Sequence, residues 1–225
     1  MNQKQKDIFL LTEGDAWFDR NYKSLKNKIY NFEDSIIKSV HKCLNSSFLL
    51  EKRKSKEEIK LLEIGCGDAR RLKWMRKNLD IQCQGIDPSA KAVEFAISNG
   101  INCIQSTADS LPFNNQDFDI VIFGFCLYLC DREDLFKIAY ETNRVLKSNS
   151  WLIINDFFSK IPIANNYHHY PNVLSYKMDY RKIFNWHPDY TCYEHKILKN
   201  KNTGYIDDPA EWIATSIIRK NTLHE

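Results

Sequence analysis

A short apolar segment followed at once by two glycines most constrains how this chain can fold. Residues 61–67 read LLEIGCG, and Asp87 ends a second apolar segment twenty residues beyond Gly67. The glycines let the backbone pass close to a ligand, and a helix that follows them presents free N–H groups. A carboxylate at the end of the second strand can accept hydrogen bonds from both hydroxyls of a ribose. The segment therefore predicts a site for a nucleoside.

The spacing of the glycines indicates which nucleoside. A dinucleotide site carries G-x-G-x-x-G, which would require a third glycine at position 70. Arg70 occupies that position. The small Ala69 instead lies two residues after the second glycine, and Glu63 lies two residues before the first. This pattern disfavours an NAD-dependent dehydrogenase, which is the competing class of enzyme.

The pattern E-x-G-x-G-x-A resembles the first motif of the class I S-adenosylmethionine-dependent methyltransferases. Further segments resemble that family in order and spacing: ADSLPF at 108–113, DFDIVI at 117–122 and ETNRVLK at 141–147. Ser-Asn-Ser replaces the family's usual Pro-Gly-Gly turn, and Asn149 is expected there in the left-handed conformation. The resemblance implies a Rossmann-like α/β fold. Its sheet has seven mostly parallel strands with a terminal antiparallel strand, and helices cover both faces.

Strands and helices are expected to alternate, which predicts a parallel sheet. Strands are expected at 59–64, 81–86, 101–105, 118–124 and 151–156, and near 190–198 and 210–219; helices are expected at 68–79, 89–99 and 131–147. Residues 12–22 have the polar composition of a turn, helical periodicity runs from Ile29 to Leu44, and 200–204 have turn chemistry. We expect a single domain over 1–225. Its parts are an N-terminal helical cap (1–58), a cofactor-binding core (59–156), an aromatic substrate lid (157–189) and terminal strands (190–225).

The resemblance implies S-adenosylmethionine as cofactor and S-adenosylhomocysteine as product. It implies that Asp87 binds the ribose, that Asp109 accepts from the adenine amino group, and that Glu63 orients the glycine turn. A surface turn is the alternative for Asp87, and a helix N-cap is the alternative for Asp109. Trp17 either closes over the ligands or forms a hydrophobic staple. The further expected cofactor contacts are Gly65, Cys66, Gly67, Ala108, Phe123, Gly124 and Asn21.

Methyl transfer to a hydroxyl requires alignment and removal of a proton. His168 and His169 lie in the aromatic lid, and a neutral imidazole suits that proton transfer near pH 7. Packing or exposed histidines are the alternative. Asp179 and Tyr180 are further catalytic candidates.

Two segments resemble small bacterial methyltransferases of surface-glycan and nucleotide-sugar pathways: EGDAWFDRN at 13–21 and SYKMDY at 175–180. That resemblance implies a sugar hydroxyl as acceptor. Another small metabolite, or a non-catalytic cofactor-binding subunit that supports a partner, are the alternatives.

Composition restricts the partners. Thirty-two basic residues against 29 acidic ones leave a net charge of +3, which gives no strong case for nucleic acid. Seven cysteines without regular spacing predict free thiols in a reducing compartment and no zinc site. No signal peptide and no apolar run of bilayer length are apparent. We therefore expect a cytoplasmic monomer or homodimer with a small, sugar-like acceptor, no membrane or nucleic-acid partner and no required metal.

Overall fold

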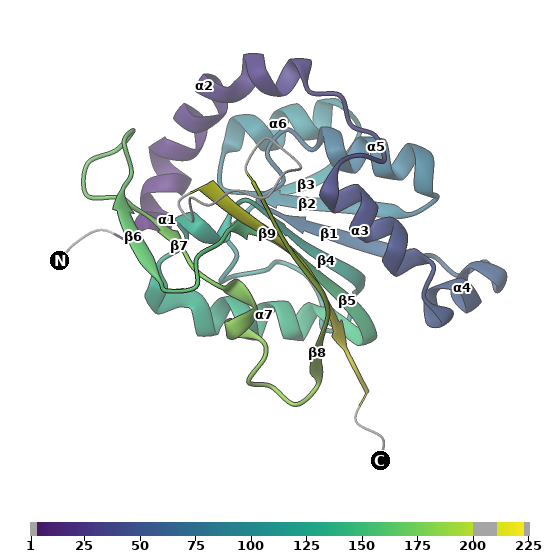
Figure 1. Ribbon diagram of the computed structural model, residues 1–225. Coiled ribbons are helices and arrows are strands. Elements are labelled where there is room, and N and C mark those ends of the chain that lie inside the picture. The colour runs from purple at the N-terminus through teal and green to yellow at the C-terminus, as the bar shows by residue number, and fades with distance from the viewer. Residues whose placement is uncertain (1–3, 200–210, 223–225) are drawn as a thin grey trace.

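The computed structural model describes residues 4–199 and 211–222, and it is built around one large sheet (Figure 1). Among these residues the sheet has seven strands in the order β3-β2-β1-β4-β5-β9-β8. The strands are β1 (Lys60–Ile64), β2 (Gln82–Asp87), β3 (Asn102–Gln105), β4 (Phe118–Gly124), β5 (Leu146–Phe157), β8 (Tyr190–Lys199) and β9 (Trp212–Lys220). The first five run parallel, and β9 is antiparallel to both of its neighbours. The predicted Rossmann-like fold with a terminal antiparallel strand is thus confirmed.

Successive side chains of a strand point to opposite faces of the sheet, so apolar side chains stand on both faces. Helices bury both. Leu61 and Ile120 join a core with side chains of four helices, whereas Leu62 and Val121 join a second core on the other face. The helices of the first face are α3 (Ser35–Leu44), α4 (Ser47–Lys54), α5 (Arg70–Leu79) and α6 (Ala90–Ser98), and α7 (Leu135–Val145) covers the second. Burial on both faces explains why β4 is apolar without a break from Ile120 to Phe123.

The N-terminal section is more helical than the sequence predicted. α1 (Gln5–Ile8), a π-helical turn η1 (Phe9–Glu13) and α2 (Gly14–Asn27) follow one another where residues 12–22 were expected to form a turn. Tertiary contacts with α6 account for the difference. Phe18 packs against Phe95 with ring centroids 6.0 Å apart, and Asp15 accepts a hydrogen bond from the Ser89 hydroxyl at 2.7 Å. The predicted periodicity from Ile29 holds only from α3 onward, since Ile29 is 83% exposed.

The segment after β5 folds over the second face. β6 (Ile163–Asn166) and β7 (Leu174–Lys177) pair as an antiparallel hairpin, and a 3₁₀ turn η4 (Tyr180–Ile183) follows. The Gln5 amide bridges this hairpin to the rest of the chain, because it donates to the carbonyls of Leu174 and Leu129.

Three smaller expectations concern turns and ends. β5 begins five residues earlier than predicted, and Asn149 within it has φ +57°, as expected. α7 begins at Leu135 rather than 131, after a 3₁₀ turn η3 (Arg132–Asp134). The predicted turn at 200–204 lies outside the described residues.

Within 4–199 and 211–222, the helices are all too short or too polar to cross a bilayer.

A fully buried carboxylate fastens the amino end of the sheet. Asp119, near the start of β4, accepts hydrogen bonds from Lys52 Nζ at 2.7 Å and Lys147 Nζ at 3.0 Å. It also accepts one from the main-chain N–H of Lys60 at 2.9 Å. One side chain thereby joins α4, β1 and β5.

We expect Asp119→Asn to lower the free energy of unfolding by about 3 kcal/mol, because it leaves two partly buried ammonium groups without a counter-charge. Asp117→Asn is the matched control: Asp117 pairs with Lys60 at 2.8 Å near the surface, where such a pair contributes less than about 1 kcal/mol. Urea unfolding measures both losses. Equal losses would contradict the anchoring role of Asp119.

Candidate functional site

The carboxyl ends of the parallel strands surround a pocket, which is where open α/β sheets bind their ligands. Its walls come from the ends of β1 and β2, the loop after β3, the segment after β4 and the N-terminal section. The lining residues are Lys6, Phe9, Gly14, Trp17, Ile64, Gly65, Ile86, Asp87, Pro88, 106–109, Phe125, Cys126, 128–131, Asp134 and Ile138.

Main-chain hydrogen bonds fasten the glycine turn to β2. The N–H groups of Gly65 and Cys66 donate to the Ile86 carbonyl at 2.9 and 3.0 Å, and Gly67 N–H donates to Asp87 Oδ2 at 2.8 Å. Gly65 has φ +73°, and a Cβ at this position would lie 2.5 Å from Cβ of Cys126. Glycine is therefore required there both for its conformation and for the close approach of the segment after β4.

Asp87 lines the pocket and is held by main-chain donors. Besides the bond from Gly67, its Oδ1 accepts from Ser89 N–H at 2.9 Å. Burial raises the pKa of Asp87 to about 6, against the opposing effect of these two hydrogen bonds. Each carboxylate oxygen has a second lone pair, so the group can accept two further hydrogen bonds from a ligand. The structure places Asp87 in the pocket rather than in an exposed surface turn.

Glu63 lies behind the glycine turn rather than in the pocket. It is fully buried, forms an ion pair with Arg71 and accepts from Arg71 Nε at 3.0 Å. Burial raises the pKa of Glu63, and the guanidinium opposes that shift. A Cβ on Gly124 would lie 2.9 Å from Glu63 Oε1, so this glycine leaves room for the ion pair. Cys66, Gly67 and Phe123 are not among the residues that line the pocket.

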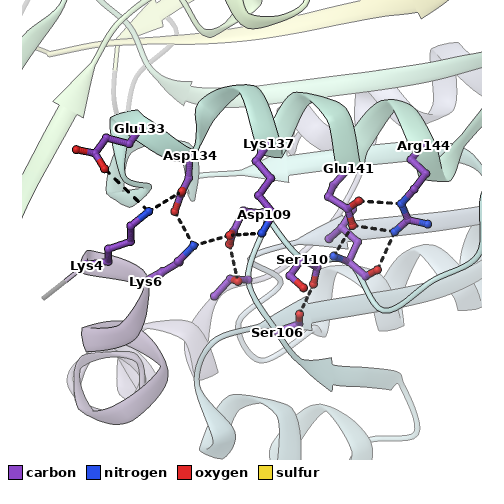
Figure 2. A network of polar contacts seen from close by, with 12 residues as sticks. Lys4, Lys6, Ser106, Asp109, Ser110, Glu133, Asp134, Lys137, Glu141 and Arg144 are labelled. Carbon is purple, nitrogen blue, oxygen red and sulfur yellow. Dashed lines mark hydrogen bonds and ion pairs between the residues drawn. The ribbon is translucent and has the colours of Figure 1, made fainter.

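Asp109 lies at the pocket in a network of charged groups (Figure 2). Its carboxylate forms ion pairs with Lys6 and Lys137 and accepts from the Thr107 hydroxyl at 2.7 Å. Burial would raise its pKa, but the hydrogen bonds from Lys6 and Thr107 hold the pKa of Asp109 below its ordinary value. Asp109 occupies a turn between β3 and β4, so it is not a helix N-cap. Ala108 lines the pocket beside it.

The N-terminal section closes one side of the pocket. Lys6 also pairs with Asp134 at 2.8 Å, and the Asp131 carboxylate accepts from the N–H groups of Gln5 and Lys6, both at 3.2 Å. Trp17 of α2 lines the pocket, whereas Asn21 lies one turn further along and donates to the Trp17 carbonyl at 2.8 Å. No local pattern in the sequence marks Lys6, because its partners lie more than a hundred residues away.

The four residues predicted from chemistry to be catalytic lie elsewhere. His168 and His169 occupy the exposed turn of the β6–β7 hairpin. Asp179 caps η4 and pairs with Arg181 at 2.7 Å, and the buried Tyr180 hydroxyl donates to the Tyr176 carbonyl at 3.0 Å. The structure does not bring these four side chains into the pocket.

Comparisons with known proteins agree with this architecture. Residues 62–154 match the family described as "Methyltransferase domain". The uncharacterized methyltransferase YcgJ of Bacillus subtilis is 27% identical over 135 residues, which are 56% of this chain and 52% of that protein. The uncharacterized protein MJ1123 of Methanocaldococcus jannaschii is 28% identical over 142 residues, which are 63% and 56% of the two chains. The chain thus spans about half the length of the curated relatives it matches.

Solved structures define the class of fold. A 1,6-didemethyltoxoflavin-N1-methyltransferase of Burkholderia thailandensis, solved with S-adenosylhomocysteine, superposes with a TM-score of 0.64 at 11% identity over 99% of this chain and 92% of that one. A SAM-dependent methyltransferase of Methanosarcina mazei gives 0.58 at 17% identity over 73% and 93%. The chain therefore has the class I methyltransferase fold, with a methyltransferase-domain match across its central strands.

We expect Gly65→Ala to destabilise the protein more than Gly67→Ala does. Both glycines have positive φ, where a side chain costs about 1–2 kcal/mol. Gly65→Ala adds a clash with Cys126, and overpacking of this kind costs a further 1–3 kcal/mol or so, whereas space around Gly67 is open. Chemical denaturation compares the two. Equal midpoints would contradict the close approach of Cys126 to the turn.

Proposed function

We propose that this protein is an S-adenosylmethionine-dependent methyltransferase that acts on a small-molecule acceptor. The observation that carries the proposal is the carboxylate of Asp87, which lines the pocket while bonded to the glycine turn. The family match and the neighbour solved with S-adenosylhomocysteine support it.

The residues present fit this cofactor. Asp87 would accept from the ribose hydroxyls, Pro88, Ala108 and Asp109 would surround the adenine, and Gly65 would lie under the methionine portion. Glu63 would act indirectly, because it holds the Arg71 side chain beneath the glycine turn. When bound, the cofactor supplies an activated methyl group with a good leaving group. The protein then contributes alignment and exclusion of water.

Different parts of the chain would bind the cofactor and close the pocket over it. The core, 59–156, would bind the cofactor, and the N-terminal section would close over it through Lys6 and Trp17. A sugar hydroxyl is the acceptor that the sequence predicts. It would require the hairpin that carries His168 and His169 to move toward the pocket, because both now lie in an exposed turn.

Titration calorimetry with S-adenosylhomocysteine tests the proposal, with NAD as the control ligand. We expect micromolar binding of the first and none of the second. Asp87→Asn should weaken binding by about 1.5–3 kcal/mol. The NH₂ group of the new side chain would face a main-chain N–H donor, and the charged acceptor for the ribose hydroxyls would be lost. Asp80→Asn, an exposed change at the end of α5, is the matched control and should leave the affinity unaltered. Binding of NAD alone, or unchanged affinity in Asp87→Asn, would refute the assignment.

The affinity should also depend on pH. Because the pKa of Asp87 is raised to about 6, its carboxyl becomes protonated as the pH falls through that value, and it then loses acceptors for the ribose. The dissociation constant of S-adenosylhomocysteine should therefore rise by up to about tenfold per pH unit below pH 6, and stay level above it. Asp87→Asn should abolish this dependence. A flat wild-type profile from about pH 5 to pH 7.5 would contradict the role of Asp87.

A further inference from the structure

Four aromatic residues line the pocket: Phe9 and the three that concern us here, Trp17, Phe125 and Tyr128. Phe125 follows the carboxyl end of β4, Tyr128 lies one turn later, and Trp17 comes from α2. Cys126, between the first two, is the residue that Gly65 approaches most closely. The aromatic side chains therefore adjoin the part of the pocket assigned above to the methionine portion of the cofactor.

Phe125 is held in an unfavourable conformation. Its φ is +57°, and its N–H donates to the Asn155 carbonyl at 2.8 Å. A bulky residue in this region costs free energy and persists where its surroundings enforce it, which occurs most often at functional sites. Phe125 is 37% exposed although its main-chain N–H is fixed by a hydrogen bond. The strain thus presents an aromatic face to the pocket instead of burying it.

Trp17, Phe125 and Tyr128 form what we call the aromatic wall, and residues of β5 hold part of it in place. Phe157 packs against Phe125 and Tyr128, with ring centroids 5.3 and 5.0 Å away. The neighbouring Asp156 carboxylate is buried and accepts from the N–H groups of Leu127 at 2.9 Å and Tyr128 at 3.3 Å. The wall is therefore preorganised, which favours a rigid, flat ligand.

Apart from Asp87, which the proposed function assigns to the ribose, the charged groups of the pocket are already engaged. Lys6 pairs with Asp109 and Asp134, and Asp131 caps α1. A hydrogen bond with Cys130, together with burial, raises the pKa of Cys126, and burial raises that of Tyr128, so both stay protonated at neutral pH. An acceptor that must lose a proton before it attacks is poorly served here, whereas a nitrogen lone pair needs no base.

From these observations we infer that the acceptor is a flat, uncharged heteroaromatic ring, stacked on Phe125, Tyr128 and Trp17 and methylated at a ring nitrogen. The inference rests on the proposed methyltransferase function. The lone pair of the nitrogen forms the new N–C bond, while the C–S bond breaks and its electron pair goes to sulfur. A ring that carries an N–H elsewhere then releases that proton to water. Aromatic faces suit this step, because they attract the positive charge that is shared in the transition state.

Saturation-transfer NMR on the protein loaded with S-adenosylhomocysteine tests this acceptor class. One panel holds flat nitrogen heterocycles (quinoline, isoquinoline, benzimidazole and indazole). A second panel holds saturated or hydroxylated rings (methyl glucoside, UDP-glucose and cyclohexanol). We expect binding to concentrate in the first panel. Equal response of the panels, or binding of the sugars alone, would overturn the inference while the proposed function stands.

Variants locate the binding. Phe125→Leu and Tyr128→Leu keep apolar volume but remove the ring faces. Each should weaken heterocycle binding by about tenfold while the dissociation constant of S-adenosylhomocysteine changes less than about threefold. Phe136→Leu, at a 77% exposed position of α7, is the matched control and should change neither. Heterocycle affinity that is unaltered in both variants would overturn the inference. Loss of S-adenosylhomocysteine binding by the wild type would refute the proposed function instead.

Discussion

The rest of the site depends on the main-chain hydrogen bonds that tie the glycine turn to β2. Gly65 and Cys66 donate to Ile86, and Gly67 donates to the carboxylate of Asp87. A main-chain donor that is buried without a partner costs free energy, so these bonds set the turn and the carboxylate in one geometry. The turn leaves no room for a side chain at Gly65, and this lets Cys126 and the segment after β4 close the pocket.

Carboxylates set the more distant walls of the pocket. Asp156 accepts hydrogen bonds from main-chain N–H groups of the segment after β4, and burial raises the pKa of Asp156 to about 7. Asp131 caps the first helix, and Lys6 then pairs with Asp109 (Figure 2). Charged side chains thus hold the N-terminal section against loops of the core. The same pairing leaves few free ionisable groups beside the aromatic wall, and this shapes the kind of acceptor that we infer.

The sequence predicted the core strands to within a few residues, because buried parallel strands read as apolar runs bounded by turn residues. It misjudged the N-terminal section. Residues 12–22 look like a turn, yet they form helix because Phe18 packs on Phe95 and Asp15 caps α6. His168 was likewise a candidate base on chemical grounds. The residues next to a histidine in the sequence do not determine which surface its side chain faces. Its hairpin places it in an exposed turn.

The sequence by itself determined features that follow from neighbouring residues. Gly65, Asp87 and the left-handed Asn149 are examples, since backbone freedom and strand ends are local properties. The tertiary structure decided which distant side chains meet. The ion pair of Lys6 with Asp109 and the wall of Trp17 with Phe125 depend on how helices and loops pack, and no spacing along the chain encodes that. Local geometry thus defined the glycine turn, and long-range packing defined the pocket around it.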